Sequence, residues 1–184
     1  MKKAFFTLFF LAILVSVAFP QSNQNPLQQR DVLLSGGLSL GSMQGSTSSL
    51  NWSATITYGG SISLDYVLPI NFPLSLGIEA GFLTRGGNFA FSNIPIMARA
   101  AWHPFLEVRN LNTYLVAKAG LGIGAFSYLG SRDWEFGFGT GCMIGIRYFV
   151  SDRIGIFAEA GYTRFFFDRF YAAGYTNIGI TFKF

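Results

Sequence analysis

Charged residues are scarce in this sequence. Only 12% of its 184 residues are charged, roughly half the share of an ordinary soluble domain, whereas 51% are hydrophobic and 17% are aromatic. Beyond the N-terminus the chain also lacks an uninterrupted apolar run of about 20 residues, the length that a membrane-spanning helix needs. These two absences argue against a soluble domain and against a helical membrane protein. Strands that face lipid remain as the structure that suits such a composition.

Residues that carry chemistry are equally scarce. Cys142 is the single cysteine, so no disulfide forms within the chain. His103 is the single histidine; it precedes Pro104 in an expected turn, where a position at the membrane interface accounts for it, and one histidine makes no metal site. The sequence shows no Ser–His–acid arrangement, and the alternating glycines from Gly120 to Gly124 lack the spacing of a nucleotide-binding loop. We expect no catalytic residue, metal site or cofactor.

The N-terminus has the pattern of an export signal. Lys2 and Lys3 precede an apolar stretch from Ala4 to Val17, and Ser16 and Ala18 are small residues at positions −3 and −1. This predicts a signal peptide over residues 1–18, with a retained membrane anchor as the alternative, and a polar periplasmic lead-in over residues 19–30. Without the two lysines the net charge is about +2, which favours neither a nucleic acid nor an acidic partner.

Residues 31–184 alternate apolar side chains with Gly, Ser and Thr, which is the period of a strand with one face in lipid. Turn residues divide this region into eight segments, each long enough for a tilted transmembrane strand of about 9–11 residues. The segments are Val32–Ser42, Ser53–Leu68, Leu74–Thr84, Ser92–Trp102, Thr113–Tyr128, Glu135–Phe149, Ile154–Phe167 and Tyr171–Phe184. They predict an all-β fold: a closed, antiparallel, up-and-down transmembrane β-barrel of eight strands, because lipid offers no partner to an unpaired edge.

Both ends of an even-stranded barrel lie in the periplasm, so the odd-numbered connections should face outward. The first of them, Met43 to Trp52, is rich in Ser, Gly and Thr. Aromatic residues near the segment ends are typical of the girdles at the two membrane interfaces. They are Trp52, Trp102, Trp134 and Tyr148.

The alternation turns seven charged residues toward the lumen. They are Asp65, Glu79, Arg99, Lys118, Arg147, Glu159 and Lys183. Side chains fill the interior of an eight-stranded barrel, and buried charges must pair or accept hydrogen bonds. We therefore predict a charge-paired plug, mainly in the periplasmic half; the alternative is an ion or proton pathway.

Two neighbouring rows of glycine line the expected outer half of the lumen. They are Gly120, Gly122 and Gly124 on the fifth segment and Gly137, Gly139 and Gly141 on the sixth. They remove side-chain volume from one side of the barrel. One interpretation is a small cavity open to the outside or to the outer leaflet. In the other, Phe165, Tyr171 and Tyr175 fill this space from across the barrel.

The last segment ends Ile178-Gly179-Ile180-Thr181-Phe182-Lys183-Phe184. With the signal peptide and the eight alternating segments, it resembles the small eight-stranded outer-membrane β-barrel family of the OmpA/OmpX type. The resemblance implies an integral position in the bacterial outer membrane, contact with its lipids, and recognition by the outer-membrane assembly machinery through Phe182 and Phe184. Members of this family include anchors, adhesins, small channels and a few lipid-modifying enzymes. The lipid A deacylases of this architecture use a His–Ser pair near the outer rim, which this sequence lacks.

These features predict a monomeric, porin-like but non-enzymatic outer-membrane barrel with a plugged lumen, structural or surface-interacting in role. The short outer connections leave little surface for an adhesin. The alternative is a minor channel or carrier for a small hydrophobic solute, and a lipid-active enzyme is the third hypothesis.

Overall fold

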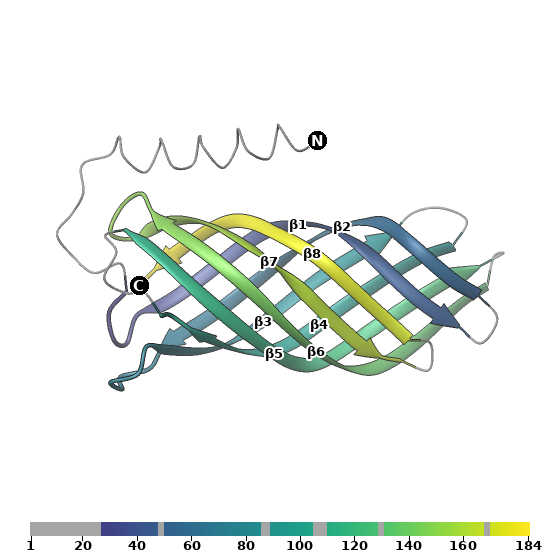
Figure 1. The fold of residues 1–184 in the computed structure, drawn as a ribbon, viewed down its shortest axis with the longest axis horizontal. Helices are drawn as coiled ribbons and strands as arrows, with labels where there is room; N and C mark the ends of the chain where they lie inside the picture. Colours follow the sequence, from purple (N-terminus) through teal and green to yellow (C-terminus); the bar gives the residue numbers. More distant parts are fainter. Residues whose placement is uncertain (1–26, 48–49, 86–88, 105–109, 129–130, 168–169) are drawn as a thin grey trace.

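Eight antiparallel strands form a closed barrel, in the order of the sequence (Figure 1). The computed structural model describes residues 27–47, 50–85, 89–104, 110–128, 131–167 and 170–184, so the predicted signal peptide lies outside the described residues. The strands are β1 (Val32–Thr47), β2 (Leu50–Val67), β3 (Leu74–Arg85), β4 (Phe89–Trp102), β5 (Leu111–Tyr128), β6 (Ser131–Phe149), β7 (Ile154–Phe166) and β8 (Phe170–Lys183). Within these ranges, no helix has the length and apolar character needed to cross a membrane. The predicted fold class and strand number are confirmed.

The strands are strongly staggered around the barrel. Following paired residues from Leu34 leads through Leu64, Ile78, Ala98, Ala119, Thr140, Arg164 and Ala172 and returns to β1 at Gln44. A stagger of this kind tilts the strands against the barrel axis, and for eight strands it leaves an interior that side chains can fill. Residues far apart in the sequence therefore meet in the lumen.

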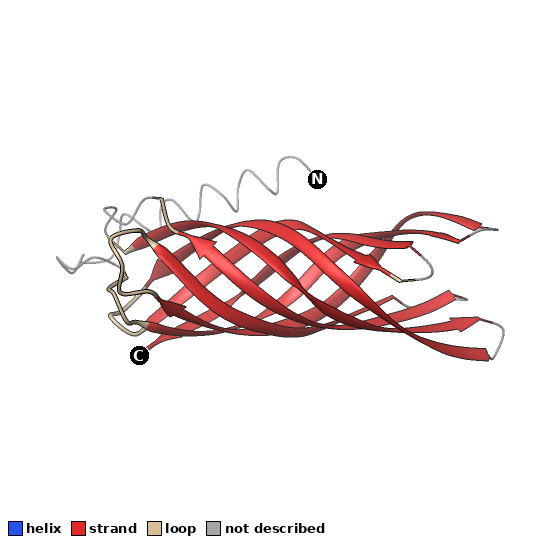
Figure 2. Cartoon of the chain, turned by 90° about the horizontal axis from the view of Figure 1, so that it is seen from below, coloured by secondary structure: helices blue, strands red, loops and turns tan. Residues whose placement is uncertain are grey.

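The two ends of the barrel differ in how well the sequence predicted them. At the end that holds the C-terminus, called the periplasmic end below, the strand limits agree with the prediction to within two residues. At the outer end the strands run almost to the tips of the hairpins (Figure 2). The predicted connection from Met43 to Trp52 was wrong: Gly45 pairs with Trp52 and Thr47 with Leu50, beyond a shift of register between Met43 and Gly45. Small polar residues continue the ladder there, since pairing outside lipid needs no apolar face.

The outside of the barrel is apolar on every strand. Each strand has at least one large apolar side chain that is half exposed or more: Leu38, Ile56, Ile78, Ile96, Leu121, Ile144, Ile156 and Ile178. Trp102 and Trp134 are also exposed, and Phe72 stacks on Trp102 with the ring centroids 6.3 Å apart. The side chain of Trp52 lies outside the described residues. Such an exterior suits a lipid environment, where exposing apolar surface has no cost.

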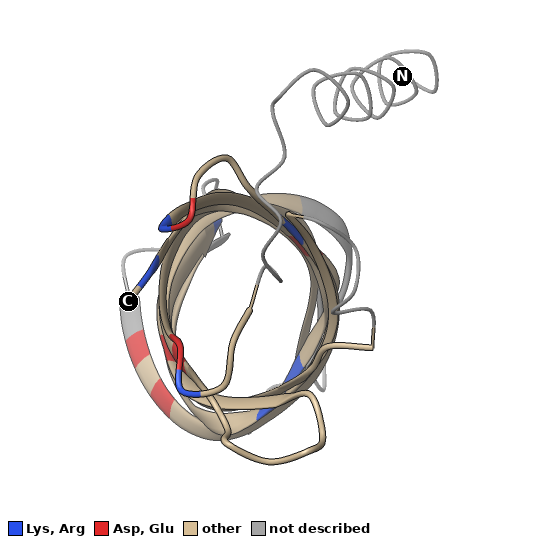
Figure 3. Ribbon diagram, turned by 90° about the vertical axis from the view of Figure 1, so that its left-hand side faces the viewer, with Lys and Arg blue, Asp and Glu red and all other residues tan. Residues whose placement is uncertain are grey.

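Residues 27–31 run from the wall of the barrel into its periplasmic mouth (Figure 3). Leu27 is buried in one cluster with Leu33, Val67 and Phe149. The Arg30 amide donates to the Val67 carbonyl at 2.9 Å, and the Val67 amide donates to the Asp31 carbonyl at 2.9 Å. The last residues of the predicted lead-in, together with Asp31, thus form a hydrogen-bonded strap at the mouth.

Candidate functional site in the lumen

Arg99 on β4 is the centre of a buried charge network in the lumen. Its Nε lies 3.0 Å from Asp65 Oδ1, its Nη1 donates to Glu79 Oε2 at 2.8 Å, and its Nη2 donates to Glu159 Oε1 at 2.8 Å. None of these four residues is more than 4% exposed. A guanidinium presents its donors in a planar fork, so one side chain can meet carboxylates from several directions. The network thereby connects β2, β3, β4 and β7.

Lys118 on β5 completes the pairing of the acidic groups. Its Nζ donates to Glu79 Oε1 at 2.7 Å and Oε2 at 2.6 Å, and to the Tyr175 hydroxyl at 3.4 Å. The Tyr114 hydroxyl donates to Glu159 Oε1 at 3.0 Å. Glu79 therefore faces two cations, whereas Glu159 faces one cation and a phenol.

Arg147 on β6 is held differently. Its Nε donates to Thr181 Oγ1 at 3.0 Å, its Nη2 donates to Ser35 Oγ at 3.4 Å, and its guanidinium lies 4.8 Å from the centre of the Tyr114 ring. With Arg147 included, three buried acidic and three buried basic side chains have no net formal charge. A buried array of charges is tolerated when it is neutral and its members are hydrogen-bonded.

The structure places Lys183 apart from these six residues. It is the last residue of β8, where the barrel wall ends, and its ammonium lies 4.0 Å from Asp31 Oδ2 at the periplasmic rim. Both side chains are about 15% exposed, so the pair is reached by water. The alternation directs Lys183 inward, but its long side chain carries the charge to the rim.

Ser75, His103 and Asn112 form a second hydrogen-bonded group of polar residues, which was not predicted. His103 Nε2 lies 3.0 Å from Ser75 Oγ, and His103 Nδ1 lies 3.1 Å from Asn112 Oδ1. All three residues are buried, which corrects the interfacial position predicted for His103. The chain turns inward after β4, where the His103 amide donates to the Pro73 carbonyl at 2.8 Å. Ser75 and Asn112 lie on the inner faces of β3 and β5, which are not neighbours in the sheet, and His103 lies beyond the end of β4, where no strand was predicted.

The imidazole of His103 is neutral in this environment. Burial, reinforced by the positive charge of Arg147, lowers the pKa of His103 to about 4. With Asn112 Oδ1 accepting from Nδ1–H, Nε2 is left to accept the Ser75 hydroxyl. Chains of Ser, His and an orienting partner activate nucleophiles in acyl transfer. Here Ser75 is only 1% exposed, so the described structure offers no path for a substrate.

The outer half of the lumen is filled by aromatic rings. A Cβ on Gly122 would lie 2.6 Å from the Phe165 ring, one on Gly139 would lie 2.5 Å from it, and one on Gly137 would lie 2.6 Å from the Phe167 ring. The two rings stack with their centroids 5.7 Å apart. These glycines therefore provide the space that the rings occupy, which favours the filled interpretation over an open cavity.

Other members of the predicted glycine rows are confined as well. A Cβ on Gly120 would meet the backbone of Ile96, and one on Gly141 would lie 2.6 Å from Thr163 Oγ1. Gly124 is buried on the same face. Phe91 packs edge-on against Phe167 with the centroids 6.4 Å apart. Tyr175 is buried in the same cluster as these rings, and the Lys118 ammonium lies 5.7 Å from the centre of its ring. The side chain of Tyr171 lies outside the described residues.

The remaining predicted residues lie on the outer surface. Phe182 and Phe184 are 43% and 73% exposed and end the lipid-facing side of the last strand. Cys142 is exposed on β6. Across the described ranges, no three His, Cys, Asp or Glu side chains are placed to hold a metal ion.

Solved structures with the same architecture are known. The Neisserial surface protein A, NspA, matches with a TM-score of 0.68 at 18% identity, over 83% of this chain and 97% of that one. Ail, the attachment invasion locus protein of Yersinia pestis, matches with a TM-score of 0.56 at 16% identity, over 85% of this chain and all of the other. No protein-family model and no curated protein sequence matches the chain. The fold is that of the small eight-stranded barrels of the bacterial outer membrane.

Proposed function

We propose that this protein is an integral outer-membrane barrel with a closed lumen, non-enzymatic and structural or surface-interacting in role. The neutral network around Arg99 is the observation that carries the proposal. An ion crossing the lumen would have to separate pairs at 2.6–3.0 Å in a region from which solvent is excluded. Breaking one member of such an array leaves an uncompensated buried charge, which costs about 3–5 kcal/mol.

The aromatic rings of Phe165 and Phe167 also support a closed lumen. They fill space in the outer half of the lumen, whereas the charge network fills the periplasmic half, so each half obstructs the lumen independently. Outer-membrane lipids around the apolar exterior, and the assembly machinery acting on Phe182 and Phe184 during insertion, are the partners that we propose. The monomer is the functional unit in this proposal.

Planar-bilayer recording tests the closed lumen. The wild-type barrel should give no discrete openings. A variant with Arg99→Ala, Glu79→Ala and Phe165→Ala, which removes obstruction from both halves, should give openings if it folds. Refolded wild-type protein that conducts in discrete steps, after its purity has been checked, would replace the closed barrel with a channel.

The arrangement of Ser75, His103 and Asn112 makes a hydrolase the second candidate. A fluorophosphonate that reacts with activated serine should not label the folded wild-type protein, because Ser75 is buried. A Ser75→Ala variant provides the background. Labelling that depends on Ser75 would show that the lumen opens and would overturn the non-enzymatic proposal.

A further inference from the structure

Tyr114 on β5 contacts both buried polar groups of the periplasmic half. Its hydroxyl donates to Glu159 Oε1 at 3.0 Å, in the charge network, and its ring centre lies 5.7 Å from that of His103, in the other group. The guanidinium of Arg147 lies 4.8 Å from the centre of the same ring. The ring occupies the space over Gly145, since a Cβ there would overlap it. Polar side chains of both groups therefore surround one aromatic ring.

Three polar atoms in this region form no hydrogen bond with any described residue. They are Arg147 Nη1, Asn112 Nδ2 and Glu159 Oε2, and the three residues are at most 2% exposed. Other atoms hold these side chains in place: Arg147 Nε donates to Thr181 Oγ1, and Asn112 Oδ1 accepts from His103. A buried donor or acceptor without a partner is unfavourable, because it has given up its hydrogen bonds to water. These three atoms therefore require a partner that the described chain does not supply.

The strand register brings the three residues to one part of the lumen. Asn112 and Arg147 are directly paired between β5 and β6, and both are buried on the inner face. Directly opposite residues have Cβ atoms about 4.5–5.5 Å apart. Glu159 is paired with Gly145, two residues before Arg147, so it lies on the diagonal, about 7–8 Å away and within reach of a long side chain. Two donors and one acceptor therefore face the same part of the lumen.

The charge and hydrogen-bonding capacity of these atoms define what they can bind. Three acidic and three basic side chains already balance in the lumen, so a bound ion would leave a net charge where solvent is excluded. An apolar group would satisfy none of the three atoms. A water molecule adds no charge, and buried waters typically form about three hydrogen bonds to polar groups of the protein. Two donors and one acceptor match that number.

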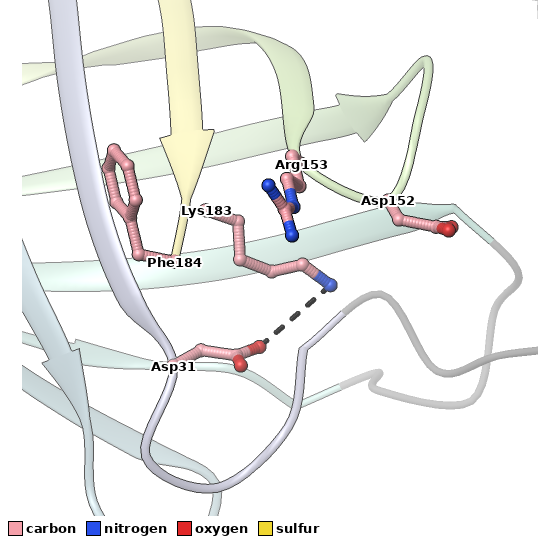
Figure 4. Close-up of a pocket in the computed structure, with 5 residues that line it drawn as sticks. All are labelled: Asp31, Asp152, Arg153, Lys183 and Phe184. Atoms are coloured by element: carbon pink, nitrogen blue, oxygen red, sulfur yellow. Dashed lines mark ion pairs between the residues drawn. The ribbon is translucent and has the colours of Figure 1, made fainter.

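Water is available at the periplasmic rim, close to these residues. Figure 4 shows the rim pocket, about 410 Å³ in volume, where Lys183 forms a partly exposed ion pair of 4.0 Å with Asp31. Two acidic and two basic side chains line this pocket, so it has no net formal charge. The Lys183 ammonium lies 5.3 Å from the centre of the Phe149 ring, and Phe149 is the next inward-facing residue after Arg147 on β6. The apolar layer that contains Phe149 therefore separates the three buried atoms from solvent.

We propose that an ordered water molecule is bound at these three atoms. Its oxygen accepts hydrogen bonds from Arg147 Nη1 and Asn112 Nδ2, and it donates one hydrogen bond to Glu159 Oε2. The water joins the charge network to the polar group of His103, so that the two form one continuous set of hydrogen bonds. This site goes beyond the proposed function, because a closed lumen does not require it. A conducting barrel would leave the site intact, so the two proposals fail separately.

A high-resolution crystal structure of the whole folded barrel tests this site. The wild-type map should show one water peak within about 3.2 Å of all three atoms. Asn112→Leu removes one of the two donors with little change in side-chain size, and the peak should be lost. Asn177→Leu is the matched control, because Asn177 is likewise buried but its Nδ2 already donates to Ser61 Oγ at 2.7 Å. In this control the peak should be retained.

Three results would overturn the proposal. The wild-type map could show other ordered waters but none at these atoms. The peak could respond alike to Asn112→Leu and Asn177→Leu, which would mean that the Asn112 amide does not hold it. Crystals grown in bromide could show an anomalous peak at the same position, which would identify an anion instead of a water. Wild-type crystals decide the first and third points even if Asn112→Leu does not assemble.

Discussion

The two halves of the lumen are closed by different physical means. In the periplasmic half, charged side chains from six strands, β2 to β7, sum to no net formal charge, so each side chain depends on its partners. In the outer half, aromatic rings lie against glycines, so closure depends on volume. Removing one charged side chain should therefore destabilise the whole network. A change in side-chain volume in the outer half, in contrast, should be compensated by an opposite change in a neighbouring side chain.

Arg99→Leu should have the largest effect. It removes the cation that contacts Asp65, Glu79 and Glu159, leaving buried carboxylates underpaired, at a cost of about 3–5 kcal/mol or more. Urea unfolding in lipid vesicles, followed by Trp fluorescence, measures the free energy of unfolding. Arg30→Gln at the exposed strap serves as a control and should leave the midpoint unchanged. A normal midpoint for Arg99→Leu would show that the network does not hold the barrel together.

Glu79→Ala should destabilise the barrel more than Glu159→Ala. Glu79 faces both Arg99 and Lys118, whereas Glu159 faces Arg99 and the Tyr114 hydroxyl. We expect about 3–5 kcal/mol for Glu79→Ala and a smaller loss for Glu159→Ala. The same unfolding assay ranks them. The reverse order would mean that Tyr114, rather than Lys118, dominates the pairing.

Gly139→Leu should destabilise the barrel by about 1–3 kcal/mol, because the added side chain overlaps the Phe165 ring. Phe165→Ala in the same chain should restore part of that stability, giving a favourable coupling energy in a double-mutant cycle. If Gly139→Leu alone left the stability unchanged, the outer half of the lumen would contain empty space. That result would support the alternative function, a carrier for a small hydrophobic solute.

His103 should make stability depend on pH in a defined window. Its pKa is lowered to about 4 in the folded state against about 6.5 when unfolded, so the unfolded chain binds the proton first. Its contribution is therefore fully present above about pH 6.5 and falls as the pH drops toward 4, by about 1 kcal/mol at pH 5.5. Unfolding midpoints at pH 7.5 and 5.5 measure this change. His103→Asn should reduce the difference, and an unchanged difference would assign it to other groups.

Cysteine labelling tests the orientation without altering stability. In a Cys142→Ser background, Asp133→Cys near the outer hairpin should react with an impermeant thiol reagent on intact cells. Asp152→Cys, exposed in the turn between β6 and β7, should react only after the outer membrane is opened. The opposite pattern would exchange the two ends of the barrel.

Alternation along the strands explains why much of the fold could be predicted. Because side chains change face at every residue, the apolar face of β7 assigns Glu159 to the lumen without knowledge of any contact. The partners of Glu159 could not be predicted in this way. Its ion pair with Arg99 crosses the lumen from β7 to β4 and depends on the stagger of the whole sheet.

Residues outside the strands limited the prediction of the site. His103 follows the last residue of β4 and lay in an expected turn. Phe167 follows the last residue of β7; the seventh predicted segment placed it on the inner face, but it was not named among the residues that fill the lumen. His103 nevertheless connects Ser75 with Asn112, and Phe167 fills the space at Gly137. The lengths of β1 and β2 were underestimated at their outer ends. Many residues there are small or polar, so the apolar alternation that predicts a strand is missing.

The ion pair between Arg99 and Glu159 has a consequence for how the barrel assembles. β4 and β7 are not neighbours in the sheet, so their charged side chains meet only across a nearly finished cylinder. A half-formed sheet in the bilayer would carry both charges without the ion pair between them. Partly inserted forms are therefore unfavourable, and cooperative insertion, in which closure and charge neutralisation occur together, is built into the arrangement of side chains inside the wall.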